Sequence, residues 1–423
     1  MRVTMVLGDD FLFPYLDDRV FREAVTLKRE GWEVSLVCWA RTITNRSLDH
    51  LPPVTEYKGI QVHRIYQNIS PTKSMLIIRI IQHLKGMRKM AKKIKETKPD
   101  VIHYNDFNTL FSIVFGGKKG GPKILYDSHE DYPSMIKSAV PHTLAKIAAR
   151  FERYIVKNHA DAVITVSPPI LKRLTKLGIK KSELILNCKD LKDYDIPRDR
   201  IIGARKKLIH SADTKASEIG ISNAHSGVDD VDSKFILLYI GSLGENRGLR
   251  ELLAAVKSLD AKENVILVIG GHGSIQDELK AAMEDIENAF FIGEVSTHDV
   301  PLYTKACDCV FMMMNPKEEW HKIAMPNKLF EAMAAGKPII ASSGTLYAGV
   351  VKKEECGVVV PYGDIHRLIQ IVMELVKNPE LRNKLGENGL KAAERGYNWE
   401  SQGKKLVGLY QRLGEEIKVN KMS

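Results

Sequence analysis

Cysteine is scarce in this chain and follows no recognisable pattern. The 423 residues contain 5 Cys, an odd number at irregular spacing, which excludes a fully paired disulfide framework. Cys307 and Cys309 stand one residue apart in an apolar stretch, and no second pair follows that would complete a zinc site. The cysteines are therefore expected to be small buried apolar residues in a reducing cytoplasm.

Long apolar runs are missing as well. No run approaches the ~20 apolar residues that a helix needs to cross a bilayer. Met1 leads straight into the apolar stretch Val3 to Leu7, without the charged leader of a signal peptide. With 44% hydrophobic and 27% charged residues, the composition is that of a soluble protein. We expect a cytoplasmic protein of two large or three small domains, since a domain takes roughly 150 residues.

Acidic residues are too few to balance the basic ones. The formal net charge is +11, which favours anionic partners such as nucleic acid, an acidic membrane or a phosphorylated ligand. Residues 73–98 hold nine Lys or Arg against one Glu and no aromatic residue, which argues against a base-stacking nucleic-acid platform. Apolar residues recur there at helical spacing: Ile80, Leu84, Met87, Ala91 and Ile94. The stretch is either a packed surface helix with a solvated outer face or a docking helix for anionic lipid.

What the chain does have is a regular alternation of strand and helix patterns. Val3 to Leu7 predicts a strand, Arg19 to Glu30 a helix, and Glu33 to Trp39 the next strand. This order implies a parallel sheet with covering helices, which is the α/β class. We expect a first domain over residues 1–190, followed by a linker or partly helical insertion over 191–233.

One histidine ends a predicted strand among carboxylates. The segments DVIHYND and KILYDSHEDYP each contain a strand with a polar end, and parallel sheets bind ligands beyond the carboxyl ends of their strands. His129 lies at such an end near Asp106, Asp127 and Glu130, which favours a functional over a structural histidine. No second His follows at helical spacing, so His129 and Glu130 form no zinc motif.

Residues 325–343 predict a loop, a short helix, a tight stop and a buried strand. Pro326 suits the first helical turn, where its missing N–H would have no partner, and Asn327 is a plausible helix cap. Gly336 is expected to end the helix in a left-handed conformation, after which the chain enters an apolar strand.

Lys328 and Glu331 fall in the first turn of this predicted helix. The free N–H groups and the dipole of a helix start favour an anion, and a nearby ammonium adds to that preference. The Glu331 carboxylate can accept hydrogen bonds from two adjacent sugar hydroxyls. The pattern therefore predicts a site for phosphate plus ribose. The alternative is that Glu331 only balances the helix dipole and that Lys328 is solvated.

Two glycine turns precede this helix. The strand FILLYI is followed by the turn 241–244, of sequence GSLG, and glycine lets the backbone approach a phosphate closely. Gly271 lies in a second glycine turn after the next strand, which does not complete a dinucleotide fingerprint. The first strand of the chain leads into Gly8-Asp9-Asp10 instead of a glycine-rich fingerprint, which argues against a NAD-dependent dehydrogenase.

Taken together, these segments resemble the retaining, nucleotide-sugar-dependent glycosyltransferases of family 4. The likeness covers nearly the whole chain and is strongest from Phe235 to Tyr362. It implies the GT-B architecture, in which two Rossmann-like, doubly wound α/β domains face a cleft. Residues 1–190 would hold the acceptor, 234–396 the nucleotide sugar, and 397–423 would form a helix that crosses back to the first domain.

The resemblance also implies roles for single residues. His129 would face the donor sugar, Arg247 and Lys328 would neutralise the leaving diphosphate, and these three are the expected catalytic residues. Glu331 would bind the ribose, as in the family branch that carries a PNKLFE run. The expected donor-binding residues are Gly241, Ser242, Arg247, Gly271, Asn327, Lys328 and Glu331. The resemblance implies no metal and no cofactor besides the donor.

The sequence departs from the family pattern at two positions. Most members have an Arg after the first Gly, where this chain has Ser242, and a Glu eight positions before Glu331, where it has Ile323. Which residue holds the hexose hydroxyls of the donor is therefore open, and the local candidates are Glu318, Glu319, His321 and Lys328.

The resemblance predicts transfer of a sugar from a UDP- or GDP-sugar to a saccharide or lipid-linked acceptor, with retention at the anomeric carbon. The enzyme would be cytoplasmic, at the inner face of the membrane if residues 73–98 dock on lipid, and would bind no nucleic acid. Two alternatives stay open. One is a nucleotide-sugar epimerase of related architecture, and the other is a non-catalytic nucleotide-sugar-binding partner in a polysaccharide-assembly complex.

Overall fold

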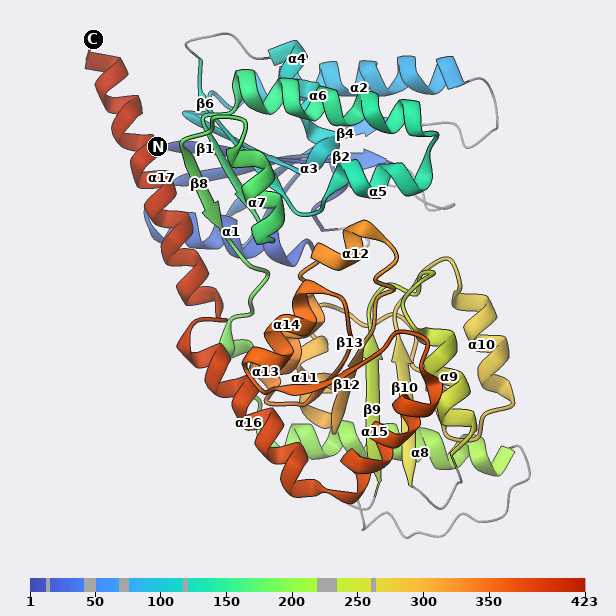
Figure 1. Cartoon of the computed structure of the whole chain (residues 1–423). Coiled ribbons are helices and arrows are strands. Elements are labelled where there is room, and N and C mark those ends of the chain that lie inside the picture. The colour runs from blue at the N-terminus through green and yellow to red at the C-terminus, as the bar shows by residue number, and fades with distance from the viewer. Residues whose placement is uncertain are drawn as a thin grey trace. The chain divides into compact units, whose positions relative to one another are not determined.

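The chain forms two compact units in a computed structural model (Figure 1). Unit 1 comprises residues 1–186 and 402–423, and unit 2 comprises residues 187–401. The structure describes residues 1–12, 16–41, 51–67, 76–116, 121–218, 234–259 and 264–422. The first three residues of the basic stretch 73–98 and the last part of the predicted insertion, 219–233, lie outside the described residues.

Unit 1 is built on an eight-stranded sheet with the order β3-β4-β2-β1-β5-β6-β7-β8. Only the β3–β4 pair of this sheet is antiparallel among the strands that the structure describes. Strands such as β5 and β7 are buried along their whole length, as expected for a parallel sheet covered on both faces. The strands are β1 (Arg2–Leu7), β2 (Glu33–Arg41), β3 (Val54–Tyr57), β4 (Ile60–Gln67), β5 (Val101–Asn105), β6 (Lys123–Ser128), β7 (Ala162–Thr165) and β8 (Lys181–Leu184).

Helices cover both faces of this sheet. The predicted helix at 19–30 is found as α1, where the Asp17 side chain accepts a hydrogen bond from the Val20 N–H and caps the first turn. The helical elements are α1 (Asp18–Arg29), α2 (Leu76–Glu96), α3 (Asp106–Thr109), the 3-10 turn η1 (Leu110–Ser112), α4 (Ile113–Gly116), α5 (Tyr132–Ala139), α6 (His142–His159) and α7 (Pro168–Thr175).

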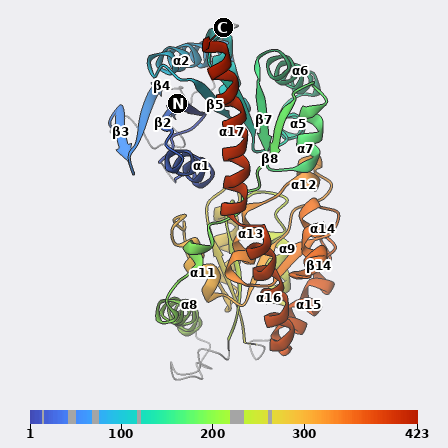
Figure 2. The ribbon, with the colours of Figure 1, turned by 90° about the vertical axis from the view of Figure 1, so that its left-hand side faces the viewer.

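The last helix, α17 (Trp399–Met422), packs on the sheet of unit 1 from Gln402 onward (Figure 2). The Tyr410 hydroxyl lies 2.9 Å from Nδ1 of His103 on β5. Glu416 forms ion pairs with Lys123 of β6 and Lys181 of β8. These contacts fasten the carboxyl-terminal helix to the strands of the first unit.

Unit 2 contains a six-stranded parallel sheet with the order β11-β10-β9-β12-β13-β14. The chain builds outward from β9 to β11, returns to the other side of β9, and continues from β12 to β14. The strand order therefore reverses between β9 and β12, and open parallel sheets bind ligands outside the carboxyl ends of their strands at such a point. The strands are β9 (Phe235–Ile240), β10 (Val265–Gly270), β11 (Ala289–Phe291), β12 (Cys309–Met312), β13 (Ile339–Ser342) and β14 (Gly357–Val360).

Helices also surround the second sheet, and the apolar faces of several of them form one core with the buried strands. They are η2 (Leu191–Tyr194), α8 (Arg198–Glu218), α9 (Leu249–Lys257), α10 (Gln276–Glu284), α11 (Val300–Ala306), α12 (Glu319–Ile323), α13 (Asn327–Ala335), α14 (Leu346–Lys353), α15 (Ile365–Lys377) and α16 (Pro379–Arg395). The predicted insertion contains α8, which is fixed to unit 2 because Arg205 donates to the Asp308 carboxylate at 2.8 Å and to the Lys234 carbonyl.

The two parallel α/β units confirm the predicted fold class, with one Rossmann-like sheet in each. All five cysteines are free and buried, as their irregular spacing predicted. None of the described helices combines the length and the apolar character needed to span a membrane.

Candidate functional site

The predicted donor-site residues of unit 2 come from loops and a helix start at the carboxyl edge of its sheet. Gly241 directly follows β9, and Gly271 directly follows β10. Lys328 and Glu331 lie in α13, which begins after the loop and the short helix that follow β12. The sequence therefore places these groups around the point where the strand order reverses.

The Lys328 ammonium lies against the backbone of Gly241. A Cβ atom at Gly241 would collide with Lys328 Nζ, and the φ of 148° at this residue is one that side chains rarely allow. The ammonium also lies 4.4 Å from the ring centroid of Tyr239, a cation–π distance. The glycine predicted as a phosphate contact thus makes room for a cation beside its own backbone.

Burial, and next the charge of Arg247, lower the pKa of Lys328 to about 8, while Glu331 opposes this shift. Ion pairs that the structure describes leave both Lys328 and Arg247 without a carboxylate partner. Two nearby cations without a carboxylate partner among the described ion pairs form a site for an anion. A bound phosphate would supply the missing charge and raise the pKa of Lys328 again.

Arg247 stands in the turn before α9. Its guanidinium carbon lies 5.5 Å from the ring centroid of Trp320, which supports the planar group from one side. The turn is held by Asn315, whose N–H donates to the Asn246 carbonyl at 2.9 Å. Gly248 closes the turn with a left-handed φ of 69°, and a Cβ there would press on Met313. The position of Arg247 therefore depends on residues that come much later in the sequence.

The two glycine turns pack backbone against backbone. The Gly241 N–H donates to the Gly270 carbonyl at 2.9 Å, and the Gly271 N–H donates to the Gly293 carbonyl at 2.8 Å. A Cβ atom at Gly271 would collide with the Gly241 carbonyl oxygen. Gly271 is therefore required for the close approach of the two turns, whatever ligand they bind. Ser242 stands where most members of the family have an Arg, and it is one of the predicted donor-binding residues. It is exposed in the first turn.

The start of α13 differs from its prediction in two respects. Pro326, with φ −71° and ψ 149°, is the N-cap residue, and Asn327 is the first helical residue and not the cap. Glu331 follows in the second turn, one residue beyond the first turn that the sequence suggested. Gly336 does end the helix in the left-handed conformation, with φ 68° and ψ 40°.

Lys189 is a residue of this site that sequence reasoning missed. Its ammonium lies 3.1 Å from Glu331 Oε1 and 3.5 Å from Asn327 Oδ1. The Lys189 carbonyl accepts a hydrogen bond from the Trp399 N–H at 2.9 Å, which fixes the backbone. The predicted ribose-binding carboxylate thus already has a cationic partner within its own unit. No motif surrounds Lys189, and only its place shortly after β8 could have drawn attention to it.

His321 stands out among the candidates for the hexose hydroxyls. Its side chain is buried and its Nδ1 lies 3.0 Å from the Asn315 carbonyl, while Nε2 has no hydrogen-bond partner among the described atoms. Burial, and in smaller part Arg247, lower the pKa of His321 to about 4. The ring is therefore neutral at pH 7, donates through Nδ1 and keeps an acceptor at Nε2. Glu318 and Glu319 are more exposed, and Ile323 is partly buried beside them.

In unit 1, His129 is held between two carboxylates. Its Nε2 lies 2.8 Å from Asp127 Oδ2 and its Nδ1 lies 3.3 Å from Asp106 Oδ2. Burial opposes the charged form, but Asp106 and Asp127 together raise the pKa of His129 well above its ordinary value. The ring is an imidazolium with both N–H groups engaged, so it acts as a fixed positive charge and not as a general base.

Asp106 has a left-handed φ of 67° at the end of β5, a conformation that is rare outside glycine. Its side chain also accepts a hydrogen bond from the His129 N–H at 3.2 Å. Such strain persists where the surroundings hold it, and it is concentrated at functional sites. The carboxyl edge of the first sheet is therefore a candidate binding edge of its own.

Behind His129 lies a buried charged cluster of Glu23, His103 and Asp127, whose ligand atoms lie within 4.8 Å of one another. The Arg19 Nε atom stands between the carboxylates, 2.8 Å from Asp127 and 3.2 Å from Glu23. The guanidinium thus supplies positive charge to both carboxylates of this cluster. Burial first, and then Asp127, raise the pKa of Glu23 to about 8, although Arg19 opposes the shift.

Two family models match the chain and together span most of it. The model described as Glycosyltransferase Family 4 matches residues 19–193, and the model described as Glycosyl transferases group 1 matches residues 223–392. An uncharacterised glycosyltransferase of Methanocaldococcus jannaschii is 25% identical over 311 residues, 72% of each chain. A putative colanic acid biosynthesis glycosyl transferase of Escherichia coli is 24% identical over 59% of this chain and 52% of its own.

Solved structures share the fold. Sucrose-phosphate synthase from Thermosynechococcus elongatus superposes with a TM-score of 0.71 at 18% identity, covering 98% of this chain and 100% of that one. The Anabaena protein HepE, solved in complex with UDP-glucose, has a TM-score of 0.65 at 15% identity and covers 99% of both chains. At these sequence identities, the similarity to the solved structures shows a shared fold and nothing further.

Proposed function

The chain belongs to glycosyltransferase family 4 and has the GT-B fold, and we propose that it transfers a sugar from a UDP- or GDP-sugar to a saccharide acceptor in glycan assembly. The observation that carries this proposal is the pair of cations Arg247 and Lys328, which lack carboxylate partners and lie at the glycine turn after β9. The proposal is supported by HepE, a protein of the same fold that was solved with UDP-glucose.

The proposed chemistry uses these cations on the leaving group. As the anomeric C–O bond breaks, negative charge gathers on the departing diphosphate, where Arg247 and Lys328 stabilise it, a task that Mg²⁺ performs in other enzymes. The acceptor hydroxyl attacks from the face that the diphosphate leaves, and its proton passes to a departing phosphate oxygen. This front-face path retains the anomeric configuration. Transfer to a defined acceptor, followed by NMR of the anomeric proton, tests it, because an inverted product contradicts it.

We propose that Glu331 binds a ribose hydroxyl and that His321 Nε2 accepts a hydrogen bond from a hydroxyl of the transferred sugar. Glu331 Oε1 is paired with Lys189, which leaves Oε2 for the ligand. Two features of His321 support its proposed contact with the transferred sugar. Its ring is neutral, and its acceptor Nε2 has no hydrogen-bond partner among the described atoms. It would take the place of the glutamate that the family has where this chain has Ile323.

A thermal-shift screen against UDP, GDP, ADP and their common sugar conjugates tests the donor site. Saturation at 100 times the dissociation constant stabilises the folded protein by about 2.7 kcal/mol, a readable shift. We expect a shift with one base that is lost in Glu331→Ala. Stabilisation by none of these ligands would contradict the proposed donor class.

Turnover assays distinguish the proposed transferase from the epimerase and from the non-catalytic binding partner. A nucleotide-sugar epimerase converts its substrate with no acceptor present and releases no nucleoside diphosphate. A non-catalytic binding partner shows donor affinity without release of UDP or GDP in any acceptor extract. The proposed transferase releases the nucleoside diphosphate in proportion to the acceptor added, which a coupled assay measures.

We also propose that unit 1 docks on an anionic membrane, where a lipid-linked acceptor would be presented. Six large apolar side chains are exposed on three helices of this unit: Ile81 and Leu84 on α2, Val114 on α4, and Leu144, Ile147 and Tyr154 on α6. We call these residues the α2–α6 face. The Phe111 ring joins the helices, since its centroid lies 5.5 Å from the His83 ring and 4.5 Å from the Phe151 ring.

Exposed positive charge lies on the same two long helices as the α2–α6 face. Exposed basic residues occur along both long helices: Lys85, Arg88, Lys89, Lys92 and Lys95 on α2, and Lys146, Arg150, Arg153 and Lys157 on α6. Each such residue contributes about 1 kcal/mol near an anionic bilayer, and the apolar side chains can enter the interface. We therefore extend the proposed docking surface from α2, which the sequence suggested, to α6.

A further inference from the structure

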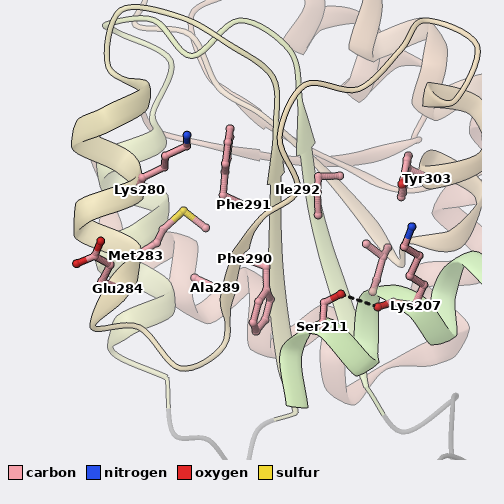
Figure 3. A pocket seen from close by; sticks show the side chains of 11 residues that line it. Lys207, Ser211, Lys280, Met283, Glu284, Ala289, Phe290, Phe291, Ile292 and Tyr303 are labelled. Carbon is pink, nitrogen blue, oxygen red and sulfur yellow. Dashed lines mark hydrogen bonds between the residues drawn. The ribbon is translucent and has the colours of Figure 1, made fainter. Parts of the chain in front are cut away.

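A cavity of about 500 Å³ lies at the free edge of the second sheet, away from the glycine turns (Figure 3). β11 is the outermost strand on this side, and the cavity is bounded by α8, α10 and Tyr303 of α11. α8 runs past the amino-terminal ends of β9 and β12, where Arg205 bonds to Lys234 and Asp308. None of the described residues that line the cavity belongs to the predicted donor site.

The floor of the cavity is apolar. Leu208, Met283 and Phe290 are buried there, with 3%, 3% and 7% of their surface exposed. Phe291 and Ile292 are only partly buried and form its inner wall. An apolar ligand body that covered these side chains would remove them from water, which is favourable in proportion to the area covered.

Two lysines border this apolar floor from opposite sides. Lys207 comes from α8 and Lys280 from α10, and Lys280 Nζ lies 4.8 Å from the ring centroid of Phe291. Glu284 is the one carboxylate among the lining residues that the structure describes, and Figure 3 shows it turned to the outer side of α10. The cavity therefore joins an apolar floor to uncompensated positive charge, with the Tyr303 ring at its other side.

We propose that this cavity binds a small organic anion, which has an apolar ring or short chain and one carboxylate, sulfonate or phosphate group. The volume falls within the range of small-molecule sites, about 300–1,000 Å³. The apolar body would cover Phe290 and Phe291, and the anionic group would pair with Lys280 or with Lys207, which border the floor from opposite sides. The site is separate from the donor site, and the proposal does not depend on the proposed transferase activity.

The probe for this proposal is 8-anilinonaphthalene-1-sulfonate, whose fluorescence rises in an apolar site. The full chain is titrated with and without UDP, so that binding at the nucleotide site is recognised by its displacement. We expect Lys207→Glu with Lys280→Glu to weaken the UDP-insensitive binding about tenfold or more, as the loss of charge-assisted contacts predicts. Ser211→Phe, on the exposed face of α8 that lines the cavity, should abolish it by filling the space.

Lys257→Glu is the matched control, because Lys257 is exposed on α9 of the same unit and does not line the cavity. It should leave the probe affinity unchanged. Phenyl phosphate should displace the probe, whereas phenol or inorganic phosphate at the same concentration should not. Probe binding that survives both the double charge reversal and Ser211→Phe overturns the proposal, and so does equal displacement by inorganic phosphate alone.

Discussion

The ammonium of Lys189 lies 3.1 Å from Glu331 Oε1, and both side chains are largely buried, with 7% and 14% of their surface exposed. Removing one partner of a buried ion pair leaves the other charge unpaired, which is costly. Glu331→Ala therefore has two consequences: it removes the proposed ribose contact and it leaves Lys189 without its counter-charge. A single substitution cannot separate them, but a double-mutant cycle can.

We predict that Lys189→Met lowers UDP affinity because it removes the charge that orients Glu331. The loss of one charge-assisted contact amounts to roughly 1.5–3 kcal/mol, and Glu331→Gln should cost a similar amount. The double variant should bind UDP about as weakly as Glu331→Gln alone, since Lys189 acts through the carboxylate. Titration calorimetry measures all four proteins, with Lys192→Met, an exposed neighbour, as control. Fully additive losses would show that Lys189 acts on the ligand independently of Glu331.

Lys328 predicts a pH dependence of donor binding. Its pKa in the free protein is lowered to about 8, first by burial and then by Arg247, and a bound diphosphate raises it again. Binding therefore takes up a proton above pH ~8, and UDP affinity should fall up to about tenfold per pH unit there. Below pH 8 the lysine is charged before the ligand arrives, so the curve should be flat. Lys328→Arg keeps its charge and should remove the decline, and a decline that persists in this variant assigns it to another group.

Arg247 is predicted to matter more for the rate than for donor affinity. If its guanidinium stabilises the charge that develops on the leaving diphosphate, Arg247→Ala should lower kcat about 10²-fold. KM should change much less, because that charge is largest in the transition state. Arg250 is the control, since it is exposed and already paired with Glu245 and Glu278. A rise in KM with kcat unchanged in Arg247→Ala would indicate ground-state binding only.

His129 predicts a pH-dependent contribution to stability. Because its pKa in the folded unit is raised by Asp106 and Asp127 despite burial, its contribution is complete below the ordinary value and is lost as pH rises through the raised value. His129→Gln should lower the free energy of unfolding by roughly 3 kcal/mol near pH 6, as expected for a broken buried pair. The difference from the wild type should shrink toward pH 9.

Urea unfolding at both pH values measures this difference. His142→Gln is the control, because His142 is exposed at the start of α6. A destabilisation that is equal at pH 6 and pH 9 would show that packing, and not the imidazolium charge, accounts for the effect of His129.

The parts of the donor site that the sequence could predict are local patterns. The glycine turn after β9 and the left-handed stop at Gly336 follow from short-range backbone requirements, and both are found. Lys189 could not be predicted, because it meets Glu331 through tertiary packing and no motif surrounds it. The cap at Asn327 was wrong for the same reason: Pro326 takes the extended cap position, and the Asn327 side chain faces Lys189.

The same limit applies to the first unit. The sequence placed His129 among carboxylates correctly, but the protonation of its ring follows from two contacts at once, with Asp106 and Asp127. The sequence predicted Arg19 only as part of a helix, although its guanidinium pairs with two carboxylates of the buried cluster behind His129. Long-range charge pairing, unlike helix periodicity, leaves no regular spacing in a sequence.

The α2–α6 face predicts binding to anionic vesicles. Leu144→Ser with Ile147→Ser should reduce flotation with phosphatidylglycerol vesicles, since both side chains are about half exposed and can enter the interface. Val419→Ser is the control, because this valine is 65% exposed on α17 and lies outside the face. Added salt should weaken binding of the wild type, as charge attraction is screened over about 10 Å at 0.1 M. Equal flotation with neutral vesicles, or equal loss in Val419→Ser, would contradict a docking face built from α2 and α6.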